Sequence, residues 1–375
     1  MMSQTMPESL PAARLLNELQ SFGARVSDPG AGAASRRGGA GPTDHKALTI
    51  DGVTIMVPVH TESASASPYF VGLPDAQGAS RISRNGIDLG AVSFPRRPRF
   101  YDLSTEDGIP YSKIAVLHGA DVLATTVLQT CVRYQSRTKT CQFCAIGESL
   151  AAGSTIARKT PAQLAAVAKA AVELDGIKHM VMTTGTPAGK DRGAAILAES
   201  AAAVKAAVDL PIQVQCEPPD DDAWFARLRA AGVDALGMHL EAVTPEVRRR
   251  IMPGKAQVPI ERYFAAFAAA VPVFGRGQVS TYILAGLGDS QAAILDMAAR
   301  LIAAGVYPFV VPFVPASGTP LAAHPSPTAA FMHGILAPLA EMLLQAGMTA
   351  ASIKAGCGKC GACSALSTYE RQLKQ

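Results

Sequence analysis

This 375-residue chain has little net charge and lacks long apolar runs. It contains 34 Lys and Arg residues and 30 Asp and Glu residues, and the resulting net charge of +4 does not indicate a nucleic-acid partner. No apolar stretch approaches the roughly 20 residues that a membrane-crossing helix needs, so no membrane partner is expected. Residues 1–16 are polar and contain acid and prolines rather than a secretory signal. We therefore expect a protein of the reducing cytoplasm.

Cysteine is also scarce, but its distribution is informative. Only seven cysteines are present, and all but Cys216 lie in two short groups. The first triad is Cys131, Cys141 and Cys144, and the second triad is Cys357, Cys360 and Cys363. Both triads contain Cys-x-x-Cys, a spacing typical of metal or iron–sulfur ligands.

The number of cysteines in each triad argues against other uses of the thiols. A closed structural zinc site needs four Cys or His ligands, and neither triad has a histidine at finger-like spacing. A disulfide framework is typical of small secreted domains, whereas 49% of this chain is hydrophobic. Each triad can instead hold an iron–sulfur cluster and leave one iron open, although a zinc site completed by a distant ligand remains the alternative for the second triad.

The N-terminal part of the chain predicts a helix, a linker and a small β-rich extension. Residues 10–24 have helical periodicity, and residues 27–42 are a Gly/Ala/Ser-rich run typical of a flexible linker. Asp51-Gly52 between two β-branched runs predicts a hairpin. We divide the chain into residues 1–44 (helix and linker), 45–111 (β-rich extension), 112–347 (barrel) and 348–375 (cysteine-bearing tail).

From about residue 112, strands alternate with Ala-rich helices, the pattern of β/α units around a parallel sheet. The helices include residues 161–175, with Thr160 as the N-cap, residues 261–274, and residues 328–347. The expected strands are residues 121–129, 177–183, 211–216, 233–240, 278–285 and 308–314. These six units are fewer than the eight of a closed barrel, so the predicted fold class is α/β with a partial (β/α)6 barrel. Its chemistry should lie at the C-terminal ends of the strands.

The first triad directly follows the first barrel strand and ends in Cys141-Gln142-Phe143-Cys144. In this the chain resembles the radical SAM superfamily, over roughly residues 112–345, and within it the biotin synthase and lipoyl synthase branch. The long spacing after Cys131 together with the second triad is similar to the radical SAM proteins encoded beside bacterial nitrilases. That resemblance implies a role linked to nitriles or other small nitrogen compounds.

Further segments match the superfamily in order, each after a barrel strand. The resemblance assigns them to S-adenosylmethionine: one turn to its amino group, one segment to its ribose and one strand end to its adenine. These are Thr183, Thr184, Gly185 and Thr186; then His239 and Glu241; then Ile283, Gly286 and Leu287. His239 and Glu241, two apart on the fourth predicted strand, should face the same way, either to bind the cofactor or as a buried hydrogen-bonded pair. Glu217, after the third strand, is a candidate site carboxylate.

The resemblance implies that the first triad ligates three irons of a [4Fe–4S] cluster and that the fourth iron binds S-adenosylmethionine. Reductive cleavage would then yield a 5′-deoxyadenosyl radical that abstracts hydrogen from a small-molecule substrate, with Phe143 shielding the cluster. A reductant such as flavodoxin or ferredoxin would be a partner. The second triad resembles an auxiliary [4Fe–4S] site that could bind substrate, relay electrons or donate sulfur.

This chain also departs from the family. Nine residues separate Cys131 from Cys141, whereas the family usually has three, and Arg133, Arg137 and Lys139 make this loop basic. We expect these charges to be solvated rather than to clamp an anion. Cys216 is expected to be a buried structural thiol. Two alternatives stay in view: a noncatalytic iron–sulfur electron carrier or metallochaperone, and a metal-independent barrel enzyme, which would leave both triads unexplained.

Overall fold

The computed structural model describes residues 12–27, 44–134, 136 and 138–374. The linker expected over residues 27–42 therefore lies outside the described residues, apart from Ser27. The strands are β1 (Arg25–Val26), β2 (His45–Ile50), β3 (Val53–Pro58), β4 (Tyr69–Val71), β5 (Ala79–Arg84), β6 (Ile87–Ser93), β7 (Val116–His118), β8 (Val122–Thr126), β9 (His179–Thr183), β10 (Ile212–Gln215), β11 (Ala235–Gly237), β12 (Val279–Ala285) and β13 (Val306–Pro312).

The α-helices are α1 (Ala12–Phe22), α2 (Glu62–Ser65), α3 (Ile146–Ala151), α4 (Pro161–Asp175), α5 (Ala194–Ala207), α6 (Ala223–Ala230), α7 (Pro245–Ile251), α8 (Ile260–Phe274), α9 (Gln291–Ala303), α10 (Ala329–Gln345), α11 (Cys357–Cys360) and α12 (Leu366–Gln372). Short 3₁₀ turns are η1 (Arg99–Asp102), η2 (Tyr111–Lys113), η3 (Lys255–Gln257) and η4 (Ala350–Ser352).

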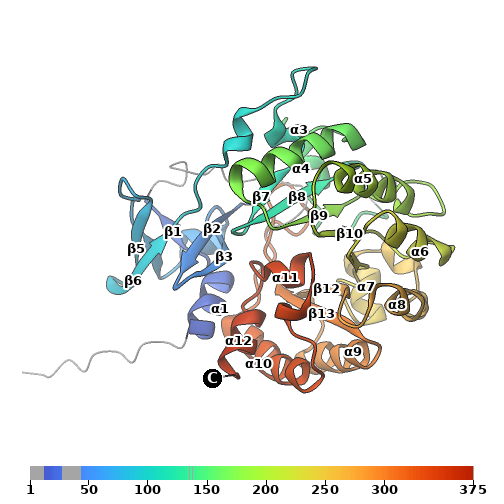
Figure 1. Ribbon diagram of the computed structural model, residues 1–375. Coiled ribbons are helices and arrows are strands. Elements are labelled where there is room, and N and C mark those ends of the chain that lie inside the picture. Colours follow the sequence, from blue (N-terminus) through green and yellow to red (C-terminus); the bar gives the residue numbers. More distant parts are fainter. Residues whose placement is uncertain (1–11, 28–43, 135, 137, 375) are drawn as a thin grey trace, which may run out of the picture.

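A curved, seven-stranded sheet forms the centre of the molecule. Its order is β13-β12-β11-β10-β9-β8-β7, with β8 to β13 parallel and β7 antiparallel at one edge. Helices α4 to α10 lie around its outer side, and the two edge strands do not pair with each other (Figure 1). The prediction of a partial (β/α)6 barrel is therefore confirmed. The fourth predicted strand is shorter than expected, because β11 ends at Gly237 and residues 238–240 lie beyond it.

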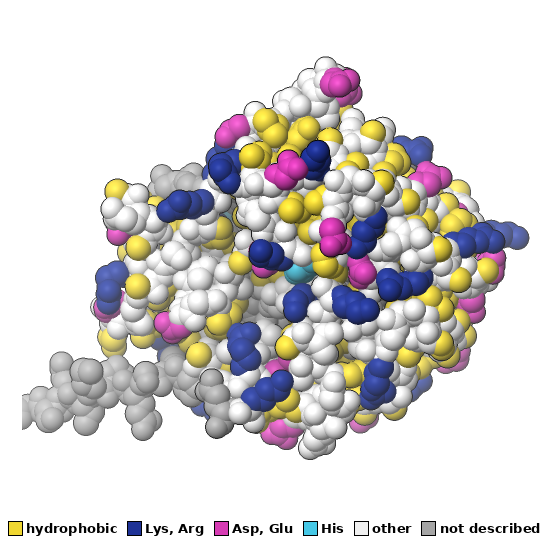
Figure 2. All heavy atoms as spheres, viewed as in Figure 1, with side chains coloured by type: hydrophobic (Ala, Val, Ile, Leu, Met, Phe, Trp, Pro, Cys, Tyr) yellow, Lys and Arg dark blue, Asp and Glu magenta, His cyan; other side chains and the backbone are white. Residues whose placement is uncertain are grey.

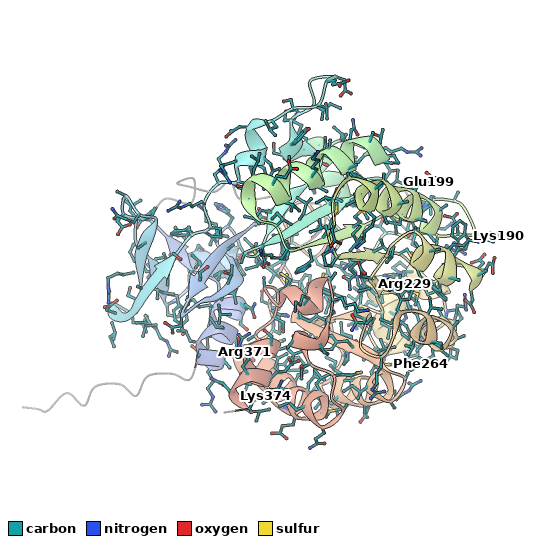
Figure 3. All side chains as sticks on the ribbon, viewed as in Figure 1. Lys190, Glu199, Arg229, Phe264, Arg371 and Lys374 are labelled. Carbon is teal, nitrogen blue, oxygen red and sulfur yellow. The ribbon has the colours of Figure 1, made fainter. Side chains whose placement is uncertain are left out.

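Local sequence accounts for the barrel elements. Every residue of β10 and β13 is buried, as expected for parallel strands covered on both faces. The side chain of the predicted N-cap Thr160 accepts a hydrogen bond from the backbone N–H of Gln163, and the Gln163 side chain accepts one from the backbone N–H of Thr160. Gly176 ends this helix at φ 68°. Charged side chains such as Glu199 on α5 and Arg229 on α6 lie on the outer side (Figure 3).

A second, six-stranded sheet of order β1-β4-β5-β6-β2-β3 lies beside the barrel (Figure 1). The predicted hairpin is present as β2 and β3, because Asp51 and Gly52 adopt the positive φ angles, 48° and 76°, that a tight two-residue turn requires. This sheet reaches the tail of the chain: the Ala362 carbonyl accepts hydrogen bonds from the Met56 N–H (2.8 Å) and from Gln20 Nε2 (3.0 Å).

The tail closes the end of the barrel where the strands begin, and α11 lies inside the ring of strands (Figure 1). The Gly356 N–H donates to His179 Nδ1 at the start of β9 (3.2 Å), and the Cys357 N–H donates to Gln213 Oε1 in β10 (3.2 Å). Gly356 has no room for a side chain, since a Cβ there would lie 2.1 Å from the Gln213 amide carbon. These contacts place the second triad at the opposite end of the strands from the first.

No helix in the described part of the chain combines the length and the apolar character that crossing a bilayer demands. On the face shown in Figure 2, Lys and Arg side chains are interspersed with Asp and Glu.

The packing of the tail predicts a pH-dependent stability. Glu370 on α12 is buried and accepts hydrogen bonds from the Tyr307 hydroxyl (2.8 Å) and the Ala350 N–H (2.9 Å). Burial raises its pKa above the ordinary value. The folded protein therefore holds this proton more tightly than the unfolded chain, and the associated stability falls as the pH rises above about 4.3.

The glutamine in Glu370→Gln cannot titrate, so this variant does not lose stability through residue 370 as the pH rises. The melting temperature of the variant minus that of wild type should therefore be larger at pH 8 than at pH 4.5. Thermal unfolding followed by circular dichroism at both pH values measures this difference. The exposed Glu62→Gln is the control and should show no such trend. A pH-independent difference for Glu370→Gln would mean that Glu370 does not carry a raised pKa.

Candidate functional site

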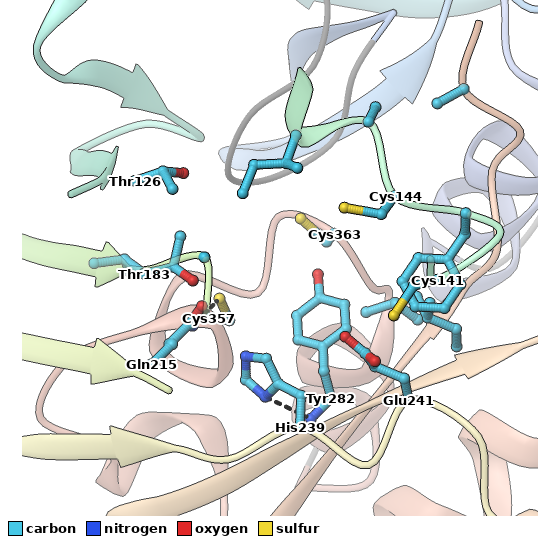
Figure 4. A pocket seen from close by; sticks show the side chains of 18 of the residues that line it. Thr126, Cys141, Cys144, Thr183, Gln215, His239, Glu241, Tyr282, Cys357 and Cys363 are labelled. Carbon is cyan, nitrogen blue, oxygen red and sulfur yellow. Dashed lines mark hydrogen bonds between the residues drawn. The ribbon is translucent and has the colours of Figure 1, made fainter. Parts of the chain in front are cut away.

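Both cysteine triads open into one cavity of about 390 Å³ inside the barrel. Its wall includes all of the first triad and, from the second triad, Cys357 and Cys363 (Figure 4). Cys360 is not among the lining residues; its Sγ lies 3.1 Å from the position that a Cβ added to Gly119 would take. Cys216 is buried, as expected for a structural thiol, but it also touches the cavity wall.

The long loop of the first triad folds back on itself. The Thr140 hydroxyl lies within hydrogen-bond distance of the carbonyls of Arg133 (3.2 Å), Tyr134 (2.9 Å) and Ser136 (2.9 Å). At its far end the Gly254 N–H donates to the Lys139 carbonyl (3.1 Å). Cys131 and Cys141 therefore both line the cavity despite their separation in sequence, and Arg133 from the loop between them lines it too.

Arg133 corrects the expectation that the basic loop is solvated. Its guanidinium is buried and makes a two-pronged ion pair with Glu217: Nε donates to Oε1 (2.8 Å) and Nη2 to Oε2 (2.6 Å). Nη1 also donates to the Gly254 carbonyl. Lys139 is exposed, as expected, and Arg137 lies outside the described residues. Burial forces Arg133 to find a partner because an unpaired charge there would be costly.

Glu217 lines the cavity, but its two oxygens are already in use. Besides Arg133, the Thr186 hydroxyl donates to Oε1 (2.9 Å). Burial opposes ionisation, yet the hydrogen bonds and charge of Arg133 hold the pKa of Glu217 below its ordinary value. Glu217 thus anchors the cysteine loop rather than presenting a free carboxylate.

A second buried ion pair joins Glu241 and Lys255, whose Nζ lies 2.9 Å from Oε2. Sequence reasoning missed Lys255, which lies 14 residues after Glu241. Burial opposes the lysine charge, but Glu241 raises the pKa of Lys255 above its ordinary value. Glu241 has φ 64°, an unusual left-handed conformation that turns its side chain toward Cys141 (Figure 4). Its Oε1 has no hydrogen-bond partner among the described residues.

The turn after β9 is joined to the start of the cysteine loop. The Val132 N–H donates to the Thr186 carbonyl (3.0 Å), and the Gly185 N–H donates to the Leu128 carbonyl (2.8 Å). A Cβ on Gly185 would lie 2.1 Å from the Thr130 carbonyl oxygen, so glycine is required. Thr183, Thr184 and Thr186 all line the cavity, as does Phe143, which packs against an apolar group containing Met252 and Leu287.

His239 does not pair with Glu241, and the two residues are not on a strand. Both line the cavity, but they make different contacts. His239 Nδ1 accepts the backbone N–H of Tyr282 (3.1 Å), and burial lowers its pKa to about 3. The imidazole is therefore neutral with its proton on Nε2.

The three residues expected to contact adenine, Ile283, Gly286 and Leu287, lie on or just after β12 but outside the cavity wall. Ile283 is fully buried in the hydrophobic core, and neither Ile283, Gly286 nor Leu287 lines the cavity. The adjacent residues Tyr282 and Leu284 do, because side chains alternate between the two faces of a strand. The Gly286 turn instead packs on Pro327, whose Cδ would lie 2.8 Å from an added Cβ. Alternation along the strand was the signal that could have identified Tyr282.

Polar side chains surround the second triad. Gln215 Nε2 lies 3.1 Å from Cys357 Sγ, and His118 Nε2 lies 3.3 Å from Cys363 Sγ. The Tyr282 hydroxyl also hydrogen bonds to Cys363. All three side chains come from barrel strands, so the barrel itself surrounds the sulfurs of the tail.

The donor sets fit iron–sulfur clusters. All seven cysteines are free thiols. Burial raises the pKa of Cys144 to about 12 and that of Cys141 well above its ordinary value, so these thiols need bound cations to become thiolates. Among the described residues, no three His, Cys, Asp or Glu could hold one metal ion together. This finding does not bear on a [4Fe–4S] cluster, whose thiolates bind separate irons.

The buried Arg133–Glu217 pair should be a large contributor to folding. Glu217→Ala leaves a buried guanidinium without its counter-charge and should lower the free energy of unfolding by about 3–5 kcal/mol. Urea unfolding followed by circular dichroism measures this loss. Asp220→Ala is the matched control, because its ion pair with Arg192 is much more exposed and should change stability by less than about 1 kcal/mol. Equal effects of the two substitutions would contradict the anchoring role of Glu217.

Comparison with known proteins gives a family profile and a curated relative that match parts of this chain. The sequence profile of the Radical SAM superfamily matches residues 137–301. A bacteriochlorophyllide c C-7(1)-hydroxylase from Chlorobaculum limnaeum is 32% identical over 123 residues, which cover 32% of this chain and 30% of the hydroxylase. The match thus spans under a third of that relative's length.

Two solved structures overlap with part of this chain. Methylornithine synthase is 17% identical with a TM-score of 0.45, over 66% of this chain and 70% of the synthase. Coproporphyrinogen III oxidase from Escherichia coli is 17% identical with a TM-score of 0.38, over 60% of this chain and 52% of the oxidase. The matched profile shows that residues 137–301 of this chain carry a Radical SAM superfamily domain.

Proposed function

We propose that this protein is a radical SAM enzyme that removes a hydrogen atom from a small molecule held inside the barrel, between two iron–sulfur clusters. The observation that carries the proposal is the shared cavity: Cys131, Cys141 and Cys144 line it at one end of the strands, and Cys357 and Cys363 line it at the other. A noncatalytic electron carrier would have no need of an internal cavity between its two cysteine sets.

In this proposal the first triad holds a [4Fe–4S] cluster with one iron open to S-adenosylmethionine. When bound and reduced, the cluster supplies the electron that cleaves S-adenosylmethionine to methionine and a 5′-deoxyadenosyl radical. Glu241 binds a ribose hydroxyl through Oε1, which Lys255 leaves without a partner among the described residues. Thr183 and Thr184 lie on the turn proposed for the amino group. Phe143 and Leu284 provide apolar walls that exclude water from the reacting carbon.

The second triad is proposed to hold an auxiliary [4Fe–4S] cluster. Gln215, His118 and Tyr282 contact its sulfurs, as expected for a site whose ligands are oriented by hydrogen bonds. A flavodoxin or ferredoxin is the proposed source of electrons. A role in a nitrile-linked pathway, and placement in the biotin synthase and lipoyl synthase branch, remain proposals that rest on sequence resemblance alone.

The size of the cavity favours a small substrate. About 390 Å³ lies at the lower end of the range for small-molecule sites, and S-adenosylmethionine must occupy part of it. The name of the relative from Chlorobaculum limnaeum describes hydroxylation of bacteriochlorophyllide c at C-7(1). The cavity is better suited to a similar C–H activation on a much smaller molecule.

Cysteine variants test the activity. After anaerobic reconstitution with iron and sulfide and reduction with dithionite, wild type should form 5′-deoxyadenosine, measured by liquid chromatography. Cys141→Ala and Cys144→Ala should form none, because each removes one of three cluster ligands. Cys131→Ala should also be inactive, since Cys131 faces the same cavity despite its distance in sequence.

Cys216→Ala is the matched control, because this thiol also lines the cavity but belongs to neither triad; it should retain activity. Normal activity of Cys131→Ala would mean that another residue is the third ligand. A folded wild-type protein that retains its iron but forms no 5′-deoxyadenosine would favour the electron carrier.

Metal content tests the second cluster. The reconstituted chain should contain about eight irons, four for each triad. Replacing Cys357, Cys360 and Cys363 together by alanine should halve the iron measured by mass spectrometry and leave cleavage of S-adenosylmethionine at least partly intact. Loss of all iron would show that the two sites depend on each other, and stoichiometric zinc in the wild type would identify the second triad as a zinc site.

A further inference from the structure

Between the two triads, neighbouring strands present polar side chains to the cavity. Thr126 of β8 is in register with Thr183 of β9, and Thr183 is in register with Gln215 of β10. This register continues to Gly237 of β11 and Ser280 of β12, and His239 and Tyr282 lie two residues beyond these positions, joined by the bond from the Tyr282 N–H to His239 Nδ1. We name the five cavity-lining residues Thr126, Thr183, Gln215, His239 and Tyr282 the polar collar; all are labelled in Figure 4.

Gly237 makes room for two members of the collar. It is in register with Gln215, and a Cβ on it would lie 2.8 Å from His239 Cε1 and 3.0 Å from Gln215 Cγ. The glycine therefore lets both side chains occupy the space that an inward-pointing side chain would fill.

The orientation of each polar atom follows from its partners. Because His239 Nδ1 accepts a backbone N–H, its Nε2 carries the proton and is a donor. The Cys357 N–H requires an acceptor at Gln213 Oε1, and Gln215 Nε2 donates to the same atom (2.8 Å). Gln215 Oε1 is then an acceptor, and no hydrogen-bond partner for it is found among the described residues.

The Thr126 hydroxyl is an independent sign of a ligand. It is buried and, among the described residues, has no hydrogen-bond partner, although such a hydroxyl costs about 1–3 kcal/mol when left unpaired. Its neighbour Thr125 faces the opposite side of β8, where its hydroxyl donates to the Ile114 carbonyl (2.6 Å). A buried polar atom that faces a cavity without a partner is expected where a bound molecule supplies one.

The described Arg, Lys and Glu side chains that line the cavity are paired with one another. Arg133 is paired with Glu217 and Lys255 with Glu241. A charged ligand group at the collar would lack a counter-ion, and burying an unpaired charge is far more costly than burying a hydrogen-bonded neutral group.

We propose that Thr126, Gln215 and His239 of the polar collar form the substrate-binding subsite, which takes an uncharged group that both accepts and donates hydrogen bonds, of the carboxamide class. The carbonyl oxygen accepts from His239 Nε2–H and from the Thr126 hydroxyl, and the amide N–H donates to Gln215 Oε1. This inference rests on the proposed function, because it assigns what lies beside the two clusters.

Three probes of nearly the same shape test the choice of charge: acetamide, acetate and acetamidinium. Binding to the anaerobically reconstituted protein is measured by ligand-observed NMR in the presence of S-adenosylmethionine. Acetamide should bind, and both ions should bind at least about tenfold more weakly. Thr126→Val should weaken acetamide binding about tenfold through the loss of one hydrogen bond, without lowering the melting temperature.

Thr125→Val is the matched control on the same strand: it should lower the melting temperature and leave acetamide binding unchanged. His239→Asn keeps an acceptor for the Tyr282 N–H but removes the Nε2 donor, and should also weaken acetamide binding. Absence of acetamide binding to wild type, equal binding of the ions, or full binding by Thr126→Val overturns the proposal. Formation of 5′-deoxyadenosine by the same wild-type preparation tests the proposed function separately.

Discussion

The buried ion pair between Arg133 and Glu217 is the constraint on which the first cysteine site depends. Arg133 lies two residues after Cys131, and Glu217 lies two residues after β10, so the pair fastens the long loop to the end of the sheet. Thr186 binds the same carboxylate and links the turn after β9 to this anchor. Without such a fastening, the nine residues between Cys131 and Cys141 would leave the position of Cys131 undetermined.

The barrel organises its two ends differently. At the C-terminal ends of the strands, ion pairs hold Cys141 and its neighbours: Glu241 and Lys255 lie beside it, and Glu217 is close by. At the N-terminal ends, the polar side chains of Gln215, Tyr282 and His118 contact the sulfurs of the tail. The N-terminal sheet reinforces this second end through the Ala362 carbonyl. The cavity between the two ends is therefore bounded by charged pairs on one side and by polar side chains on the other.

Much of this architecture was accessible from local patterns. Alternating strands and Ala-rich helices predict the parallel sheet, and the Asp51-Gly52 turn and the Thr160 cap are determined by neighbouring residues. The first triad was placed correctly at the ends of the strands, because every loop that follows a parallel strand emerges at the same edge. The roles of Ile283 and His239 were harder to predict, since they depend on where a strand ends and which way its last side chains point.

The sequence by itself determined the two triads, the alternation of strands and helices, and the Asp51-Gly52 turn, because each depends on residues close together in the chain. Only the tertiary structure decided that Arg133 meets Glu217, that Lys255 meets Glu241, and that the tail enters the barrel to place Cys357 beside Gln215. The Gly356–His179 contact joins residues 177 positions apart. Contacts of this kind follow from how the whole chain buries its apolar surface and pairs its buried charges, and no local pattern encodes them.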